Sequence, residues 1–197
     1  MNGLYALKPW YAERLAEPRR VLVRCHVPPT VVSWSGVAAA AGGGAVLATM
    51  SHRPLTAILV AGFLALRLAC ANLDGGLARA TGRNTAWGGV VNEVTDRLAD
   101  VLALAGLAAL VPWSLLAVAV FAATLPSWIS LAGAAAGTAR VQGGPVGKTE
   151  RCVLLVLIAA SGHATLVVGV IAVGSLVTAV SRALIVRRLA SSAGGAR

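Results

Sequence analysis

Long apolar runs separated by short polar connections are the feature that most constrains this chain. Runs of roughly 18 to 22 residues recur along the sequence, and a helix of that length crosses a ~30 Å hydrocarbon core. The composition agrees, because 57% of the 197 residues are hydrophobic and only 12% are charged. Ala and Gly are abundant, and such small residues let membrane helices pack closely. We therefore expect an all-α integral membrane protein.

Six transmembrane helices account for the apolar runs. Their expected positions are about 30–50, 55 to beyond 70, 90–110, 114–136, 152 to a turn at 161–163, and 166–189. Basic residues fall on every second connection, whereas the three intervening turns together contain one Arg. By the positive-inside rule, this asymmetry places both termini in the cytoplasm. We expect the protein in the cell (plasma) membrane.

The pattern divides the chain into three parts: a cytoplasmic or interfacial segment (1–29), a six-helix membrane domain (30–190) and a flexible cytoplasmic tail (191–197). The first segment mixes aromatic and aliphatic residues with Arg and Lys, which predicts an amphipathic helix in the membrane interface. A plain cytosolic tail is the alternative. The net charge of +10 is spread between apolar spans, so it indicates contact with anionic membrane lipids and no nucleic acid.

Carboxylates are concentrated in two fragments of this apolar sequence. Only seven residues are Asp or Glu, and four of them lie in LDGGLAR (73–79) and NEVTDRLAD (92–100). Ionisable groups at membrane depth are expensive unless paired, hydrated or metal-bound, so they mark functional positions. At about 100° per residue, four polar residues share one narrow helix face. They are Asn92, Glu93, Asp96 and Asp100, and Asp74 approaches them from the preceding span.

Oxygen ligands without His or Cys favour a hard divalent ion such as Mg²⁺, Mn²⁺ or Ca²⁺. Mg²⁺ commonly completes its shell with substrate phosphates, and the basic residues nearby fit a phosphorylated substrate. Ordinary ion pairs of Asp96 or Asp100 with Arg97 are the alternative. Arg67 is a further candidate ion partner for the acids, although the helical rise of ~1.5 Å per residue puts it about 10 Å below Asp74.

The order of these residues resembles the signature of the CDP-alcohol phosphotransferase (phosphatidyltransferase) family, D-x2-D-G-x2-A-R-x8-G-x3-D-x3-D. The positions that match at the family's spacing are Asp74, Gly75, Ala78, Arg79, Gly88 and Asp96. Two positions depart from it, because Ala71 and Asn92 stand where the family has aspartates. Asn92 still offers an amide oxygen to a metal, and Asn72 or Glu93 are candidates to replace what Ala71 lacks.

The resemblance implies an enzyme of phospholipid biosynthesis. Such an enzyme transfers a phosphatidyl-type group from a CDP-alcohol, such as CDP-diacylglycerol, to an alcohol acceptor and releases CMP. In the family, four aspartates hold two divalent ions that grip the pyrophosphate, and the last aspartate, here Asp96, is the general base. The resemblance also implies a homodimer with its active site at the cytoplasmic face.

The family pattern assigns roles to the matching residues. The expected ligands of one or two Mg²⁺ or Mn²⁺ ions are Asp74, Asp96, Asn92 and Glu93. The residues expected at the CDP moiety are Asp74, Gly75, Ala78, Arg79 and Gly88.

Basic residues predict where an acceptor phosphate binds. Lys148 and Arg151 are neighbours at i, i+3 spacing on a helix face, and Arg182 lies well inside the last span. The alternative for each of them is that it only sets the membrane topology and contacts anionic lipids. The sequence leaves glycerol phosphate, inositol phosphate, a free alcohol and an amino alcohol open as acceptors.

Three other functions remain open. The altered signature is compatible with an unusual donor or acceptor, and with a catalytically silent protein that binds lipid or nucleotide. An ion-coupled transporter is the competitor from another class, since buried carboxylates also relay ions. It is less favoured, because no internal repeat is evident and the acids gather at one membrane face.

Overall fold

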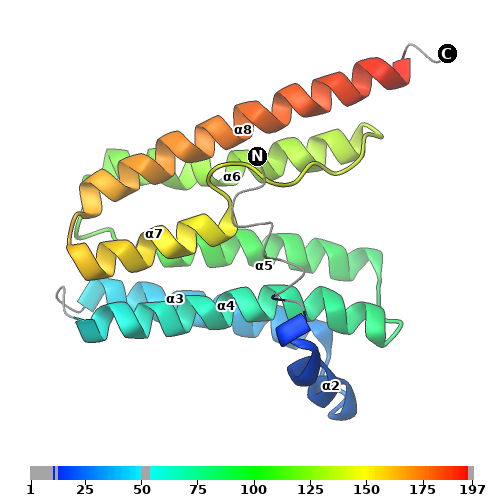
Figure 1. Ribbon diagram of the computed structural model, residues 1–197, viewed down its shortest axis with the longest axis horizontal. Coiled ribbons are helices and arrows are strands. Elements are labelled where there is room, and N and C mark those ends of the chain that lie inside the picture. Colours follow the sequence, from blue (N-terminus) through cyan, green and yellow to red (C-terminus); the bar gives the residue numbers. More distant parts are fainter. Residues whose placement is uncertain (1–10, 12, 50–53, 195–197) are drawn as a thin grey trace.

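The computed structural model describes the whole chain except residues 1–10, 12, 50–53 and 195–197. In the described part there are seven α-helices and no strand (Figure 1). They are α2 (Ala16–Arg24), α3 (Pro29–Thr49), α4 (Pro54–Ala80), α5 (Ala86–Ala105), α6 (Trp113–Ala135), α7 (Lys148–Ser161) and α8 (Ala164–Gly194). The expected all-α fold is confirmed. Residues 1–10 and 12 of the expected interfacial segment and residues 50–53 before α4 lie outside the described residues.

Four helices are long and apolar enough to cross a membrane, which makes this an integral membrane protein. They are α3, α4, α6, and α8 over Ala164–Ser192. The two remaining bundle helices fall short of that standard for different reasons. α5 carries four charged side chains, and α7 has only 14 residues. Length and composition therefore support four of the six expected spans.

Local sequence explains where the helices of the site begin. Thr85 caps α5, because its hydroxyl accepts a hydrogen bond from the Gly88 N–H at 3.0 Å. The carboxylate of Glu150 accepts a hydrogen bond from the Gly147 N–H at 3.0 Å, so α7 begins at Lys148, ahead of the start expected near 152. LDGGLAR is wholly helical, since α4 runs through it.

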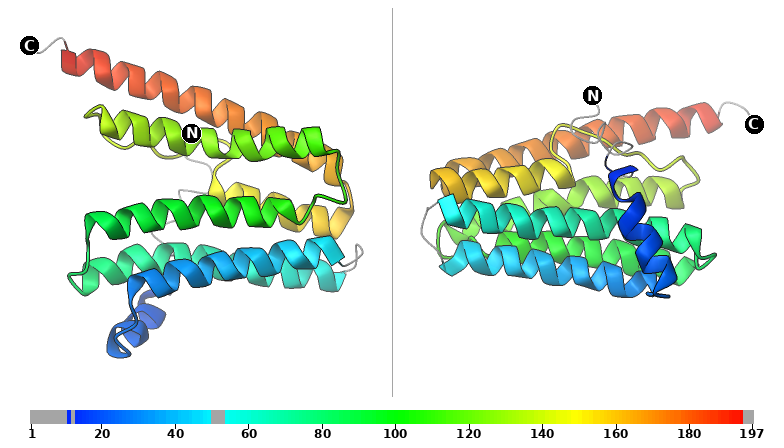
Figure 2. Two further views of the ribbon diagram at one scale, coloured as in Figure 1. Left: turned by 180° about the vertical axis from the view of Figure 1, so that it is seen from behind. Right: turned by 60° about the horizontal axis from the view of Figure 1, so that its bottom comes forward.

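The bundle has two parts that meet along α7. α3 packs against α4 and α5, α6 runs beside α8, and α7 contacts both α4 and α8 (Figures 1 and 2). Leucine and isoleucine side chains such as Leu64, Leu104 and Ile158 are fully buried in this core. α2 lies outside the bundle at one end, where Leu22 and Val23 pack against Leu73 and its neighbours (Figure 2).

The contact between α3 and α5 depends on small residues. A Cβ added to Gly44 would lie 2.5 Å from the carbonyl oxygen of Leu102. Real Cβ atoms do not approach backbone so closely, so the two helices would have to move apart. Glycine at this position therefore fixes the distance between α3, which borders the site, and α5, which carries most of its acids.

We predict that Gly44→Ala destabilises the protein by about 1–3 kcal/mol, the usual range for overpacking a core. Thermal unfolding in detergent, followed by circular dichroism, measures the change. Gly62→Ala is the matched control, because a Cβ there meets nothing within 4 Å and lies in a helix of similar polarity. Equal unfolding temperatures for the two variants would contradict the close packing.

Candidate active site

A cavity of about 430 Å³ lies where α4, α5, α6, α7 and α8 approach one another. The connection between α6 and α7 closes one side of it. Its charged and amide-bearing side chains include Asn92, Glu93, Asp96, Arg97, Arg140, Lys148, Arg151 and Arg182. Six of these side chains are predicted site residues, and the structure adds Arg97 and Arg140 to the cavity lining. The cavity thus gathers cations around the acidic helix face.

A second cavity of about 10 Å³ lies beside the first. Its polar lining consists of Ser33, Arg67, Asp74, Thr95 and Asp96. This volume is close to that of one water-sized occupant. Asp96 and Ala71 line both cavities, so the two spaces meet at the residue expected to be the base and at the missing aspartate.

Asp74 is held firmly at the small cavity. Its carboxylate accepts hydrogen bonds from the Ser33 hydroxyl at 2.9 Å and from the Gly75 N–H at 2.6 Å. The side chain is buried, and no described cation lies within ion-pair distance of it. α3 and the first glycine of the signature therefore orient this acid together.

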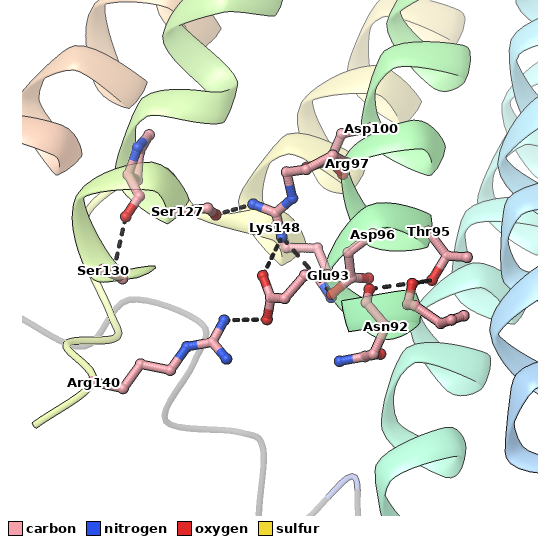
Figure 3. Close-up of polar contacts among 12 residues, drawn as sticks. Asn92, Glu93, Thr95, Asp96, Arg97, Asp100, Ser127, Ser130, Arg140 and Lys148 are labelled. Carbon is pink, nitrogen blue, oxygen red and sulfur yellow. Dashed lines mark hydrogen bonds and ion pairs between the residues drawn. The ribbon is translucent and has the colours of Figure 1, made fainter. Parts of the chain in front are cut away.

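Asp96 projects from α5 toward the start of α7. The Nζ of Lys148 lies 2.5 Å from its Oδ2, and a guanidinium nitrogen of Arg97 lies 3.8 Å from the same oxygen (Figure 3). The other oxygen, Oδ1, is 3.9 Å from Arg67. Lys148 thus contacts one oxygen of Asp96. The other oxygen of Asp96 faces Arg67, which lines the small cavity.

Asp100 joins three helices. Its two carboxylate oxygens accept hydrogen bonds at 2.5 Å, one from Arg67 of α4 and one from Arg151 of α7. All three side chains are at most 7% exposed. The expectation that Arg67 pairs with the acidic cluster is confirmed. Its depth below Asp74 matches that of Asp100, which lies one turn beyond Asp96.

Glu93 faces the large cavity and is paired with cations there. It forms an ion pair with Arg140 of the α6–α7 connection, and its second oxygen lies 3.9 Å from Arg97 (Figure 3). Arg97 also donates a hydrogen bond to Ser127 of α6. The sequence carried no signal for these contacts, because they join segments about 30 and 47 residues apart.

The remaining signature residues surround the connection between α4 and α5 and line neither cavity. The Gly88 N–H donates its hydrogen bond to Thr85, the N-cap of α5. The Ala78 carbonyl accepts a hydrogen bond from the Arg83 N–H at 2.9 Å. Arg79 lies over Gly75, with a guanidinium nitrogen 3.4 Å from where a Cβ would stand. Their contact with a CDP moiety stays a prediction.

Arg182 lines the large cavity and ties it to α8. Its guanidinium donates hydrogen bonds to the carbonyl oxygens of Gly143 and Pro126, both at 2.9 Å, and to Ser130 at 3.1 Å. These bonds hold the α6–α7 connection in place over the cavity. The expected role of Arg182 at an acceptor phosphate stays a prediction.

Charge in the site is balanced by the protein itself. Four carboxylates face this region, and all of them except Asp74 are paired. Their partners are five cationic side chains: Arg67, Arg97, Arg140, Lys148 and Arg151. A metal-binding site rich in unpaired carboxylates would show the opposite balance. The described residues therefore present a slightly positive surface that suits an anionic phosphate.

Few oxygen donors remain at the site for a divalent ion. Among the described residues, no group of three or more His, Cys, Asp or Glu is placed to hold a metal. What remains is Asp74 and Asp96 at the small cavity, and the amide oxygen of Asn92 beside the large one, which is buried without a hydrogen-bond partner. These are the residues that would hold a divalent ion at the site.

Fold and site together define a class: an all-helical membrane protein that gathers carboxylates, amide oxygen and cations around a cavity of about 430 Å³. No family model matches the chain. It is 28% identical over 166 residues to the phosphatidylinositol phosphate synthase of Mycolicibacterium smegmatis, covering 80% of this chain and 72% of that protein. It is 26% identical over 159 residues to the inner membrane protein YnbA of Escherichia coli, covering 77% and 76%.

Solved structures agree with these relatives. The phosphatidylinositol phosphate synthase of Mycobacterium tuberculosis with CDP-DAG bound matches with a TM-score of 0.66 and 25% identity, over 86% of this chain and 92% of that one. The same enzyme in complex with manganese and citrate matches with a TM-score of 0.65 and 24% identity, over 86% and 87%. In sequence and fold the chain is thus similar to phosphatidylinositol phosphate synthases, and this similarity supports its resemblance to the CDP-alcohol phosphatidyltransferase family.

We predict that Asp100→Asn destabilises the protein by about 3 kcal/mol or more, because it leaves two buried guanidinium groups with half their compensation. Chemical unfolding in detergent measures the loss. Glu17→Gln is the control, since its pair with Arg20 is largely exposed and such pairs contribute about 0–1 kcal/mol. A loss as small as that of the control would contradict a structural role for the Arg67–Asp100–Arg151 network.

Proposed function

We propose that this protein transfers a phosphatidyl-type group from a CDP-alcohol, such as CDP-diacylglycerol, to an alcohol acceptor and releases CMP, in phospholipid biosynthesis. The observation that carries the proposal is the position of Asp96, which borders both cavities. The small cavity is also lined by Asp74, the other retained aspartate of the signature, and the large cavity is lined with cationic side chains. Relatives that synthesise phosphatidylinositol phosphate, one of them with CDP-DAG bound, support the same chemistry.

The transfer needs one proton acceptor and one anion-binding surface. The Asp96 carboxylate takes the proton of the acceptor hydroxyl, whose oxygen forms a bond to the β-phosphorus of the donor. The bond from that phosphorus to the bridging oxygen breaks, and CMP leaves with the electron pair. Lys148 holds Asp96 in place, and the surrounding guanidinium groups offset the charge that develops on phosphate oxygens.

Asp74 and Asp96 are the proposed ligands of a Mg²⁺ or Mn²⁺ ion, with Asn92 and Glu93 as further oxygen donors. When bound, such an ion neutralises phosphate charge and orients the pyrophosphate. Asp74, Gly75, Ala78, Arg79 and Gly88 are proposed to contact the CDP moiety. The glycines leave backbone open to a close approach by the nucleotide, as the signature implies.

An anionic acceptor fits the large cavity best. Lys148, Arg151 and Arg182 line it, and we assign them to an acceptor phosphate such as that of glycerol phosphate or inositol phosphate. Arg140 joins this set, because its side chain is 43% exposed at the cavity wall. Each of these cations already has a partner within the protein, so binding exchanges internal contacts for contacts with phosphate.

The membrane arrangement follows from the same reasoning. We propose that all six helices of residues 30–190 cross the bilayer, including α5 and α7, which also expose valine and leucine side chains. Residues 1–29 then lie at the cytoplasmic interface and residues 191–197 form a cytoplasmic tail. Both termini and the active site face the cytoplasm of the cell membrane, and the protein works as a homodimer.

We predict that Asp96→Asn lowers the rate of CMP release at least about 100-fold, the usual range for loss of a general base, while the protein stays folded. Purified protein with CDP-diacylglycerol and a panel of alcohol and phospho-alcohol acceptors provides the assay. Glu17→Gln, which removes an exposed carboxylate that lines neither cavity, is the control for a lost carboxylate. Full activity of Asp96→Asn would contradict its role as base.

A catalytically silent protein that binds lipid or nucleotide is the second candidate, favoured by the loss of aspartates at positions 71 and 92. The same assay separates the two. Binding of CDP-diacylglycerol without CMP release for any acceptor in the panel would support the silent protein and contradict the proposed transfer.

A further inference from the structure

Arg67 is the most deeply buried charge of the site, and the proposed reaction leaves it without a role. Its side chain is 2% exposed inside a membrane-spanning helix, a placement that is costly unless the charge serves a purpose. Ion pairing with Asp100 explains only part of it. One terminal nitrogen, NH2, makes that contact, whereas NH1 is buried and has no hydrogen-bond partner.

The position of Arg67 relates it to the metal site. It lines the same water-sized cavity as Asp74, Asp96 and Ala71. On α4, Arg67 precedes position 71 by one helical turn, so both residues lie on the face that looks toward α5. Asp96 is 3.9 Å from its NH2 nitrogen, and Asp100 is 2.5 Å away. The guanidinium therefore stands among the acids, beside the place of the lost carboxylate.

Charge balance gives this position a meaning. Replacing two aspartates by Ala71 and Asn92 removes two negative charges, which is the charge of one divalent ion. A buried guanidinium among the remaining acids replaces part of the missing cation, and repels a metal ion that would bind next to it. The small cavity that Arg67 lines has room for one water-sized occupant.

We infer that Arg67 is a positioning residue that sets the metal content of the site to one ion per chain. Its guanidinium supplies beside Asp96 and Asp100 the positive charge that a second divalent ion would otherwise supply. The inference deepens the proposed function and rests on it. It concerns ion stoichiometry, which is measurable without turnover.

The experiment counts Mn²⁺ bound per chain by titration calorimetry of detergent-purified protein, with metal analysis after gel filtration as a second reading. Wild-type protein is expected to bind one ion. Ala71→Asp/Asn92→Asp restores both carboxylates but keeps Arg67, so it is expected to bind one ion more tightly. Adding Arg67→Leu to this pair is expected to raise the count to two, because it removes the competing charge and opens space.

The matched control adds Arg24→Leu instead, which removes an exposed arginine outside the bundle and is expected to leave the count at one. Zero or two ions in wild-type protein would overturn the inference, and so would two ions in Ala71→Asp/Asn92→Asp. A count of one in the folded Arg67→Leu combination would overturn it too. If that combination does not fold, the first two counts still decide.

Failure of the proposed function is read separately. Loss of CMP release with every acceptor, while the Mn²⁺ counts follow the expected series, contradicts phosphatidyl transfer and leaves the role of Arg67 intact. CMP release that persists while wild-type protein binds two ions contradicts the role of Arg67 alone.

Discussion

The double ion pair of Asp100 with Arg67 and Arg151 is the interaction on which the rest of the structure depends. It joins α4, α5 and α7 in the buried interior, where an unpaired charge would be costly. Its consequence is geometric. α5 is fixed in rotation, so Asp96 and Asn92, which lie on the same helix face, point into the cavities, and α7 is fixed where Lys148 reaches Asp96.

A site that carries its own cations differs in kind from one that recruits metal. The family's four aspartates form a strongly negative site that two divalent ions neutralise. Here the acids retained around the cavities are already paired with arginine and lysine, and Asp74 alone has no ion-pair partner among the described residues. In the proposed mechanism, the electrostatic role of metal is divided between one ion and the protein's own cations.

Much of this arrangement was predictable from sequence. The apolar runs gave the helices to within a few residues, since length and hydrophobicity decide where a membrane helix lies. Helical periodicity correctly placed Asn92, Glu93, Asp96 and Asp100 on one face. The partners Arg140 and Ser127 were not predictable, because they depend on how distant segments pack. The early start of α7 depends on the Gly147–Glu150 cap, which an apolar pattern does not report.

A crystal structure grown with Mn²⁺ and CDP-diacylglycerol tests the central claim most directly, because anomalous scattering locates manganese independently of the protein. The account predicts one manganese peak per chain, between Asp74 and Asp96, with Arg67 still paired to Asp100 and the donor's pyrophosphate beside that single ion. Two manganese peaks, or an Arg67 side chain displaced from the acids by metal, would contradict it.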